Sequence, residues 1–221
     1  LYSGVPYGWL WSEVDSQLDR DELDKELGHA ELSLRSIFEA ILVVHARMRG
    51  KSGHGAKFPV HYSQTQILLD WFPNCRLIHT TRDPRAVYAS QSVKYLRDDQ
   101  GVVSRSIDRS KQFVHINIQT TWTASVHRQL KDLPNYRLVR YEDVICDTRR
   151  VLEELCEFLE VPFSTEMLNP LQYGSSFSEF ESKRGVDRSA LDRWRTTIAP
   201  LTARSMELAH RRAFRDLGYL D

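Results

Sequence analysis

One arginine at a predicted junction between a strand and a helix is the first candidate for chemistry in this chain. Arg82 follows the segment Cys75–Thr80, which is typical of a short strand that ends at the edge of a sheet. Asp83 is a good helix-capping residue and Pro84 suits the first helical position, so we expect a helix over Pro84–Tyr95. The free N–H groups and positive end of a helix attract anions, and a guanidinium matches the shape of a phosphate or sulfate. The junction therefore predicts an anion site.

A hydroxyl further along the same predicted helix extends this site. Ser90 lies eight residues after Arg82, so its side chain can approach the same anion. The tetrapeptide Arg82–Arg85 is also compatible with a plain surface loop that is held by an ion pair. The preceding strand, the capping residue and Ser90 favour the anion site over that simpler interpretation.

The elements around the junction alternate between helices and strands. Helical patterns are expected over Asp19–Gly50, Ser63–Phe72, Pro84–Tyr95, Ser110–Leu130, from Asp147 onward, and over Ala199–Leu217. Strands are expected over Cys75–Thr80 and Tyr136–Tyr141. Loops are expected over Gly50–Gly55, Asp98–Arg109 and much of Ser164–Asp192. This alternation predicts an α/β fold with a mainly parallel sheet.

The ends of the two predicted strands indicate where a ligand binds. In α/β sheets, ligands bind beyond the carboxyl ends of the strands. Arg82 and Tyr141 both stand at such ends, so we expect two separate strands to direct them toward one crevice. Glu142 and Asp143, which follow Tyr141, are expected to be structural residues that cap a helix or pair with Arg140.

Composition excludes several other classes of protein. The 221 residues suit one domain of ordinary size, and 30 basic residues balance 30 acidic ones, which argues against bulk attraction to nucleic acid. No apolar run approaches the length of a membrane span. The three cysteines, Cys75, Cys146 and Cys156, do not have the spacing of metal ligands. The histidines His54, His61 and His79 show no paired ligand spacing either, so no metal is expected.

Four segments share their order and spacing with a known enzyme family. They are Lys57–His61, Phe72–Val87 with Ser90, Val139–Val144 with the helix before Pro162, and Arg193–Arg195 with Leu217–Leu220. Together they resemble the sulfotransferases that use 3′-phosphoadenosine-5′-phosphosulfate. The resemblance covers roughly residues 55 to 221. It implies the three-layer fold of that family, which is similar to the P-loop nucleotide hydrolases and has helices on both faces of a mainly parallel sheet.

The resemblance also implies roles for single residues in holding the donor. Arg82 and Ser90 would bind the 3′-phosphate, a group that ATP lacks, and Tyr141 would lie near the adenine. Arg184, in a basic loop before the last helix, would fold over the 3′-phosphate. Simpler interpretations stay open: Ser90 can face solvent, Tyr141 can be a core residue, and Arg184 can be a solvated loop charge.

Two further residues are implied in catalysis. Lys57 would stabilise the transferring sulfuryl group, and His61 would take the proton of the acceptor. A hydrogen-bonded structural histidine is an equally good interpretation of His61. In several branches of the family the base is a glutamate near the phosphate loop, a position that Glu13 could fill.

One part of the family pattern is not found. The family grips the 5′-phosphosulfate with a phosphate loop after its first strand, whereas Gly50–Gly53 matches only the last residues of such a loop and follows a helical segment. Leu1 is not an initiator methionine. We therefore expect residues 1–221 to form a single domain that lacks its N-terminal strand and phosphate loop.

The resemblance predicts transfer of a sulfuryl group from 3′-phosphoadenosine-5′-phosphosulfate to a hydroxyl or amine. The acceptor would be a small molecule, a carbohydrate or a peptide. Two alternatives stay open: a non-catalytic or truncated domain that binds adenosine 3′,5′-bisphosphate, and a P-loop kinase. The compartment would be the cytoplasm, or the Golgi lumen if an upstream anchor has been removed, and the oligomeric state is open.

Overall fold

The structure is a computed structural model that describes residues 18–28, 31–57, 64–96, 102–172 and 183–221. The chain divides into two compact units, Leu1–Trp71 and Phe72–Asp221. The expectation of one domain over residues 1–221 stays a prediction.

The described part of the first unit consists of helices joined by irregular segments. Helix α2 (Arg20–Leu27) begins at Asp19, whose carboxylate accepts the amide N–H groups of Asp21 and Glu22 at 3.0 and 3.2 Å. Helix α3 (Leu34–Met48) follows, and Arg47 near its end pairs with Glu26 of α2 at 3.0 Å. The helical stretch expected over Asp19–Gly50 is therefore two helices.

The end of α3 and the next helix agree with expectation. Gly50, at φ +61, starts an irregular segment that runs to Lys57, as predicted for the glycine-rich loop. Helix α4 (Thr65–Trp71) lies within the range Ser63–Phe72 that was expected to be helical.

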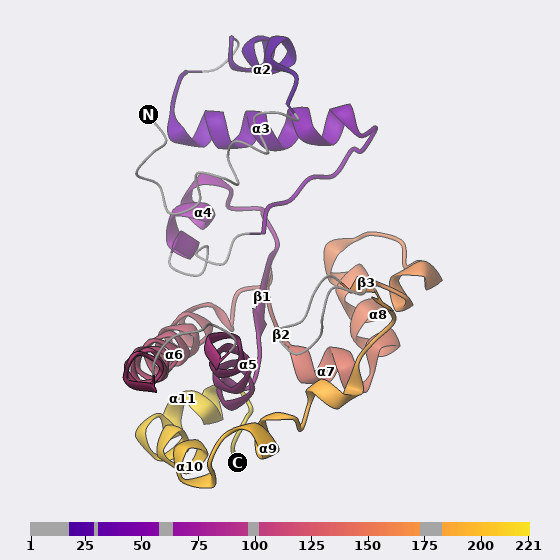
Figure 1. Ribbon diagram of the computed structural model, residues 1–221. Coiled ribbons are helices and arrows are strands. Elements are labelled where there is room, and N and C mark those ends of the chain that lie inside the picture. The colour runs from indigo at the N-terminus through magenta and orange to yellow at the C-terminus, as the bar shows by residue number, and fades with distance from the viewer. Residues whose placement is uncertain (1–17, 29–30, 58–63, 97–101, 173–182) are drawn as a thin grey trace. The chain divides into compact units, whose positions relative to one another are not determined.

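Two parallel strands form the centre of the second unit. Strand β1 (Leu77–Thr81) pairs with β2 (Tyr136–Arg140), with Leu77 opposite Tyr136 and Thr81 opposite Arg140 (Figure 1). A parallel pair needs a long connection, and here that connection is two helices, α5 (Pro84–Leu96) and α6 (Val102–Leu130). The predicted mainly parallel sheet and α/β class are confirmed.

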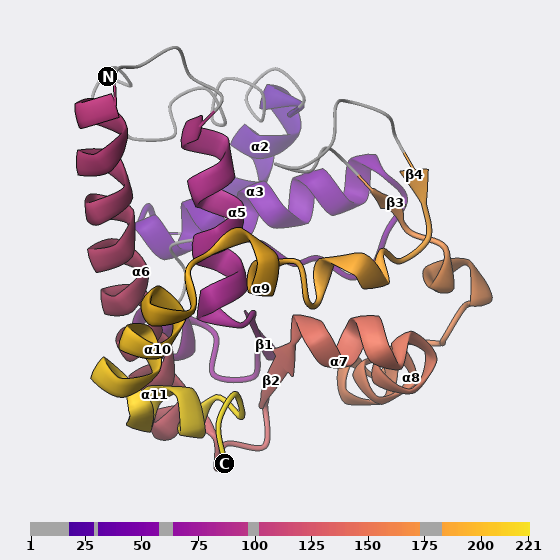
Figure 2. The ribbon, with the colours of Figure 1, turned by 60° about the horizontal axis from the view of Figure 1, so that its bottom comes forward.

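The faces of β2 contact different helices. Leu138 packs with Ala124 of α6 and with Leu217 near the C-terminus. Arg137, the preceding residue, places its guanidinium 5.5 Å from the ring centroid of Phe158 in helix α8. Neighbouring strand residues point to opposite faces, so the strands lie between two helical layers, as the predicted three-layer fold requires (Figures 1 and 2).

The elements that follow β2 are short. They are α7 (Tyr141–Cys146), α8 (Thr148–Leu159), the 3₁₀ helix Thr165–Leu168, β3 (Leu171–Gln172), β4 (Lys183–Arg184), the 3₁₀ helix Arg188–Ala190, α9 (Trp194–Thr197), α10 (Pro200–Ala209) and α11 (Arg211–Asp216). Asp147 caps α8 as expected, with its carboxylate accepting the amide of Arg150 at 3.3 Å. Strands β3 and β4 form an antiparallel pair.

Two expectations about helix boundaries were wrong. The polar loop expected over Asp98–Arg109 is helical from Val102 onward, because Val102–Leu130 contains no glycine or proline to stop the helix. The single helix expected over Ala199–Leu217 is broken at His210, whose φ of −126° and ψ of 30° are not helical. Gly218, at φ +76, ends the last helix as predicted.

The buried face of α6 is narrower than the apolar pattern suggested. Ile116 is 2% exposed, as expected, and Thr120 and Ala124 continue the same face one and two turns later. The apolar pattern of Ser110–Leu130 also predicts burial of Ile118 and Trp122, but these side chains are 57% and 50% exposed. They lie on the flank of the helix that the packing of α5 and α11 does not cover.

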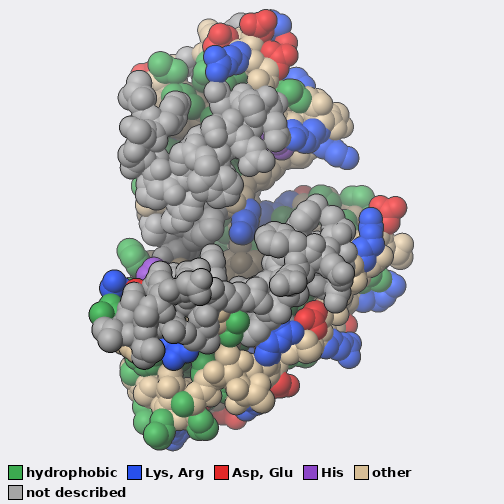
Figure 3. All heavy atoms as spheres, viewed as in Figure 1, with side chains coloured by type: hydrophobic (Ala, Val, Ile, Leu, Met, Phe, Trp, Pro, Cys, Tyr) green, Lys and Arg blue, Asp and Glu red, His purple; other side chains and the backbone are tan. Residues whose placement is uncertain are grey.

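The surface of the second unit keeps some apolar side chains. Leu201 and Leu208 of α10 are exposed, and hydrophobic side chains are visible over this helix in the lower part of Figure 3. None of the helices in the described ranges is both long and apolar enough to cross a membrane.

Candidate functional site

The register of the two parallel strands brings Arg82 and Tyr141 together. Thr81 lies opposite Arg140, so the next residues on each chain segment are Arg82 and Tyr141. The guanidinium carbon of Arg82 lies 4.5 Å from the ring centroid of Tyr141, and both side chains are half-buried. Tyr141 is the first residue of α7 rather than the last residue of the strand. The expectation that two strands direct these residues to one place is confirmed.

The turn from β1 into α5 is stabilised by its own carboxylate. Asp83 is 6% exposed, and its Oδ1 accepts the backbone N–H of Arg85 at 2.9 Å. Pro84 begins the helix, as predicted, and has no N–H to offer. The expectation of free amides at this helix start therefore fails for its first two positions, because one lacks an N–H and the other is bonded to Asp83.

Arg85 neutralises Asp83 and fixes the turn to the C-terminal helices. Its guanidinium donates to both Asp83 oxygens at 2.7 to 3.1 Å, pairs with Glu207 of α10, and lies 4.4 Å from the ring centroid of Trp194. Burial lowers the pKa of Arg85, but the hydrogen bonds and charges of the two carboxylates outweigh it and raise the pKa. The second arginine of the Arg-Asp-Pro-Arg sequence is thus a structural cation.

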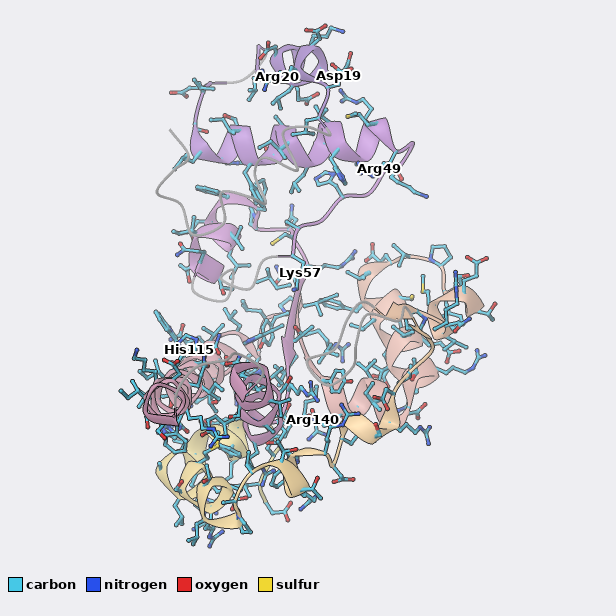
Figure 4. All side chains as sticks on the ribbon, in the orientation of Figure 1. Asp19, Arg20, Arg49, Lys57, His115 and Arg140 are labelled. Atoms are coloured by element: carbon cyan, nitrogen blue, oxygen red, sulfur yellow. The ribbon has the colours of Figure 1, made fainter. Side chains whose placement is uncertain are left out.

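The turn from β2 into α7 supplies two carboxylates with structural roles. Glu142 accepts the backbone N–H of Asp83 on Oε1 at 2.9 Å, so it links the two turns directly. Asp143 accepts two hydrogen bonds from Arg140 at 2.7 and 2.8 Å, and these bonds raise the pKa of Arg140 (Figure 4 labels Arg140, where β2 runs into α7). The prediction that Glu142 and Asp143 are structural is confirmed.

Two residues near the end of the chain reach the same turn. The hydroxyl of Tyr219 donates to Oε2 of Glu142 at 3.1 Å, and Arg140 donates to the carbonyl of Gly218. Burial, above all, and the neighbouring Glu142 charge raise the pKa of Tyr219 well above its usual range. The sequence assigns this segment only to the C-terminal part of the family resemblance. No local signal marks it, because the contact joins residues far apart in the chain.

Ser90 and Arg184 occupy separate elements. Ser90 is half-buried on α5, two turns beyond Arg82. Arg184 is exposed on β4, opposite Leu171 of β3 in the hairpin. Its predicted place over a phosphate stays a prediction.

The segment after this hairpin joins the two turns. Arg188 donates to the carbonyl of Cys146 at the end of α7 at 3.3 Å, and Trp194 packs on Ala86 and Ala89 of α5. The chain between Arg188 and Trp194 therefore runs from α7 to the first turns of α5.

The roles predicted for Lys57, His61 and Glu13 in catalysis stay predictions. Lys57 is exposed at the end of the irregular segment in the first unit. His61 and Glu13 lie outside the described residues. Within the described ranges, no group of three or more His, Cys, Asp or Glu side chains is arranged to hold a metal ion.

Comparisons with known proteins agree on one family. The model of the sulfotransferase family matches residues 9–165. Carbohydrate sulfotransferase 5 of Mus musculus is 30% identical in an alignment of 175 residues that covers 69% of this chain and 44% of that protein. Sulfotransferase 2A1 of Macaca fascicularis is 27% identical in an alignment of 124 residues that covers 52% of this chain and 42% of that protein. The chain spans less than half the length of these curated relatives.

Among solved structures, similar chains include the sulfotransferase domain of the curacin biosynthetic pathway and that of the Synechococcus PCC 7002 olefin synthase. The first is 18% identical with a TM-score of 0.48 and covers 89% of this chain and 82% of that chain. The second is 21% identical with a TM-score of 0.48 and covers 95% and 76%. The family model matches well over half of the chain, and the chain therefore belongs to the sulfotransferase family.

Proposed function

We propose that the protein to which this chain belongs transfers a sulfuryl group from 3′-phosphoadenosine-5′-phosphosulfate to a hydroxyl or amine. Family membership supports the reaction type. The observation that carries the choice of donor is the stacking of Arg82 on Tyr141 at the paired strand ends, 4.5 Å apart. A guanidinium beside an aromatic ring suits a ligand that carries both a phosphate and a purine.

The charges around Arg82 fit a phosphate. The nearest buried carboxylate in sequence, Asp83, is neutralised by Arg85, and Glu142 is occupied by an amide and a hydroxyl. The pairing of Asp83 with Arg85 therefore reduces the repulsion that this carboxylate would exert on an incoming anion. We assign Arg82 and Ser90 to the 3′-phosphate, Tyr141 to the adenine, and Arg184 to a covering role.

Sulfuryl transfer needs a nucleophile and a stabilised leaving group. The acceptor oxygen or nitrogen forms a bond to sulfur, while the bond from sulfur to the bridging phosphate oxygen breaks and leaves its electron pair on adenosine 3′,5′-bisphosphate. A cation near that oxygen stabilises the developing charge, and a base takes the acceptor's proton. Lys57 and His61 remain our predictions for these two tasks.

The class of acceptor is proposed from the relatives. One of them is named a carbohydrate sulfotransferase, so we propose a carbohydrate hydroxyl as the first acceptor to test, ahead of other small molecules and peptides. Transfer of labelled sulfate to a panel of these acceptors, by the full-length protein, would rank them. Transfer to none of them would favour the alternative of a domain that only binds the bisphosphate nucleotide.

Titration calorimetry with two nucleotides tests the donor. Adenosine 3′,5′-bisphosphate should bind more tightly than ATP, because only the former carries the phosphate that Arg82 is proposed to hold. Equal or tighter binding of ATP would contradict the proposal and favour a kinase-like site.

Arg82→Ala tests the residue that carries the proposal. Loss of a charge-assisted contact costs about 1.5–3 kcal/mol, which corresponds to roughly 10- to 150-fold weaker binding of adenosine 3′,5′-bisphosphate. Arg149→Ala is the matched control, since Arg149 is an exposed arginine on α8 whose pair with Glu153 is solvated. An affinity that is unchanged in Arg82→Ala would refute the assignment.

A further inference from the structure

We propose that Tyr219 is a positioning residue of the donor site: through Glu142 it holds the turn that carries Arg82. This inference rests on the proposed function and adds to it a residue from the C-terminal end of the chain. Tyr219 would not touch the nucleotide. It would act on the two side chains, Arg82 and Tyr141, that are proposed to do so.

The contacts form one continuous path. The Tyr219 hydroxyl donates to Oε2 of Glu142 at 3.1 Å, and Oε1 of Glu142 accepts the amide of Asp83 at 2.9 Å. Asp83 directly follows Arg82, and Glu142 directly follows Tyr141. The carboxylate of Glu142 is therefore the link between the two turns, and Tyr219 holds the second oxygen of that carboxylate.

The core of the second unit fixes Tyr219. Its ring packs against two buried clusters, one with Ile116 and Phe214 and the other with Ala213 and Leu217. A hydroxyl on a ring that is held in this way has little freedom, so it can orient the carboxylate that it bonds.

The residue before Tyr219 is fixed as well. Gly218 has φ +76, and a Cβ at this position would lie 2.9 Å from Nη1 of Arg140. Arg140 donates to the Gly218 carbonyl and at the same time to Asp143. The backbone that carries Tyr219 is therefore fastened to the end of β2, one residue before Tyr141.

Removal of the hydroxyl has a specific expected consequence. Glu142 would keep only its hydrogen bond from the amide of Asp83. Its carboxylate could then rotate, so the amide of Asp83 would bond to an acceptor that is held less firmly. Arg82 and Tyr141 would then sample more orientations and hold the nucleotide less well. The proposed contacts to the 3′-phosphate are distant from the reacting sulfur, so they are equally strong in the ground state and the transition state. Their loss raises the KM for the donor and leaves kcat unchanged.

Tyr219→Phe in the full-length protein is the test, and Tyr136→Phe is the matched control. Tyr136 is another tyrosine of the same fold, and its hydroxyl bonds to His79 and His127 on the face of the strands covered by α6. We expect Tyr219→Phe to bind adenosine 3′,5′-bisphosphate about tenfold more weakly and to raise the donor KM by the same factor at constant kcat. Tyr136→Phe should lower the thermal midpoint but leave both constants at the wild-type values.

A double-mutant cycle identifies the path. Glu142→Ala removes both acceptor oxygens, so it should weaken binding at least as much as Tyr219→Phe. Adding Tyr219→Phe to it should cause no further loss, because the link is already broken. Fully additive losses, a fall in kcat without a change in KM, or an equal effect of Tyr136→Phe would each overturn the inference. A wild-type protein that does not bind the bisphosphate overturns the proposed function, whereas a binding wild type with an unaltered Tyr219→Phe overturns only the role of Tyr219.

Discussion

Two regions of the same strand pair, the carboxyl ends and one face, are held by different kinds of polar contact. At the carboxyl ends of β1 and β2, charged groups dominate. Arg85 donates to the carboxylate of Asp83, and the carboxylate of Glu142 accepts the backbone N–H of Asp83 from the neighbouring turn. On the face covered by α6, the hydroxyl of Tyr136 lies 2.8 Å from Nδ1 of His79 and 3.1 Å from Nδ1 of His127. Burial, with a smaller contribution from His127, lowers the pKa of His79 to about 4, so this cluster is neutral near pH 7.

The difference shows how one sheet separates a binding edge from a packed interior. The charged network gathers where two turns present Arg82 and Tyr141, and its stability requires every buried charge to keep its partner. The neutral cluster needs no ion pair, but it requires histidines without an added proton. The two regions should therefore fail under different perturbations.

Arg85→Ala should break the charged network and have the largest effect on stability. It would leave Asp83 and Glu207 without their shared cation, and removal of one partner of a buried pair costs about 3–5 kcal/mol. Urea unfolding at pH 7 measures the loss. Arg149→Ala, which breaks an exposed pair on α8, should change the unfolding free energy by less than about 1 kcal/mol. Similar losses in the two variants would show that the network contributes no more than a surface pair.

Acid should break the neutral cluster. The pKa of His79 is about 4 in the folded protein, whereas an ordinary, solvent-exposed histidine has a pKa of 6.5. As the pH falls, His79 therefore binds a proton in the unfolded chain before it does so in the folded one. The stability that the neutral His79 contributes is complete above pH 6.5 and is lost progressively down to pH 4. The loss at pH 4 amounts to roughly 3 kcal/mol. Burial also lowers the pKa of His127, which adds in the same direction.

Unfolding free energies of the wild type and of His79→Asn between pH 7 and pH 4 test this expectation. Asparagine keeps a polar side chain but cannot titrate, so the variant should lose less stability over that range than the wild type does. Parallel curves would mean that carboxylates, rather than His79, control the acid response.

Gly218→Ala should have the smallest of the three effects. Alanine is disfavoured at φ +76, and its Cβ would meet the flexible end of Arg140 at 2.9 Å, so we expect a loss of about 1–2 kcal/mol. Thermal unfolding measures it. Gly53→Ala is the control, because no atom lies within 4 Å of a Cβ built there. A loss no larger than that of the control would show that the Arg140 contact is easily rearranged.

The sequence was informative where local chemistry decides the structure. The strand before Arg82, the cap at Asp83, the helix start at Pro84 and the second strand were all predictable from residue type and periodicity. The approach of Arg82 to Tyr141 was also predictable, because parallel strands end at the same edge of a sheet.

Long-range contacts were not predictable in the same way. The residues next to Glu142 in the sequence do not indicate that it accepts hydrogen bonds from Asp83 and Tyr219. Each bond depends on how the strands pair and how the helices then pack. The prediction of which α6 residues are buried failed for a related reason. Apolar residues occur around more of the helix than the neighbouring helices cover, so Ile118 and Trp122 stay exposed.

The pairing of β1 with β2 has a consequence for the order of folding. Leu77 and its partner Tyr136 are separated by about sixty residues of chain, so their contact closes a long loop and is entropically slow to form. Helices α5 and α6 can form earlier from local contacts. Arg82 and Tyr141 therefore meet only after that closure, and the appearance of nucleotide binding during refolding would report a late step rather than the first collapse of the chain.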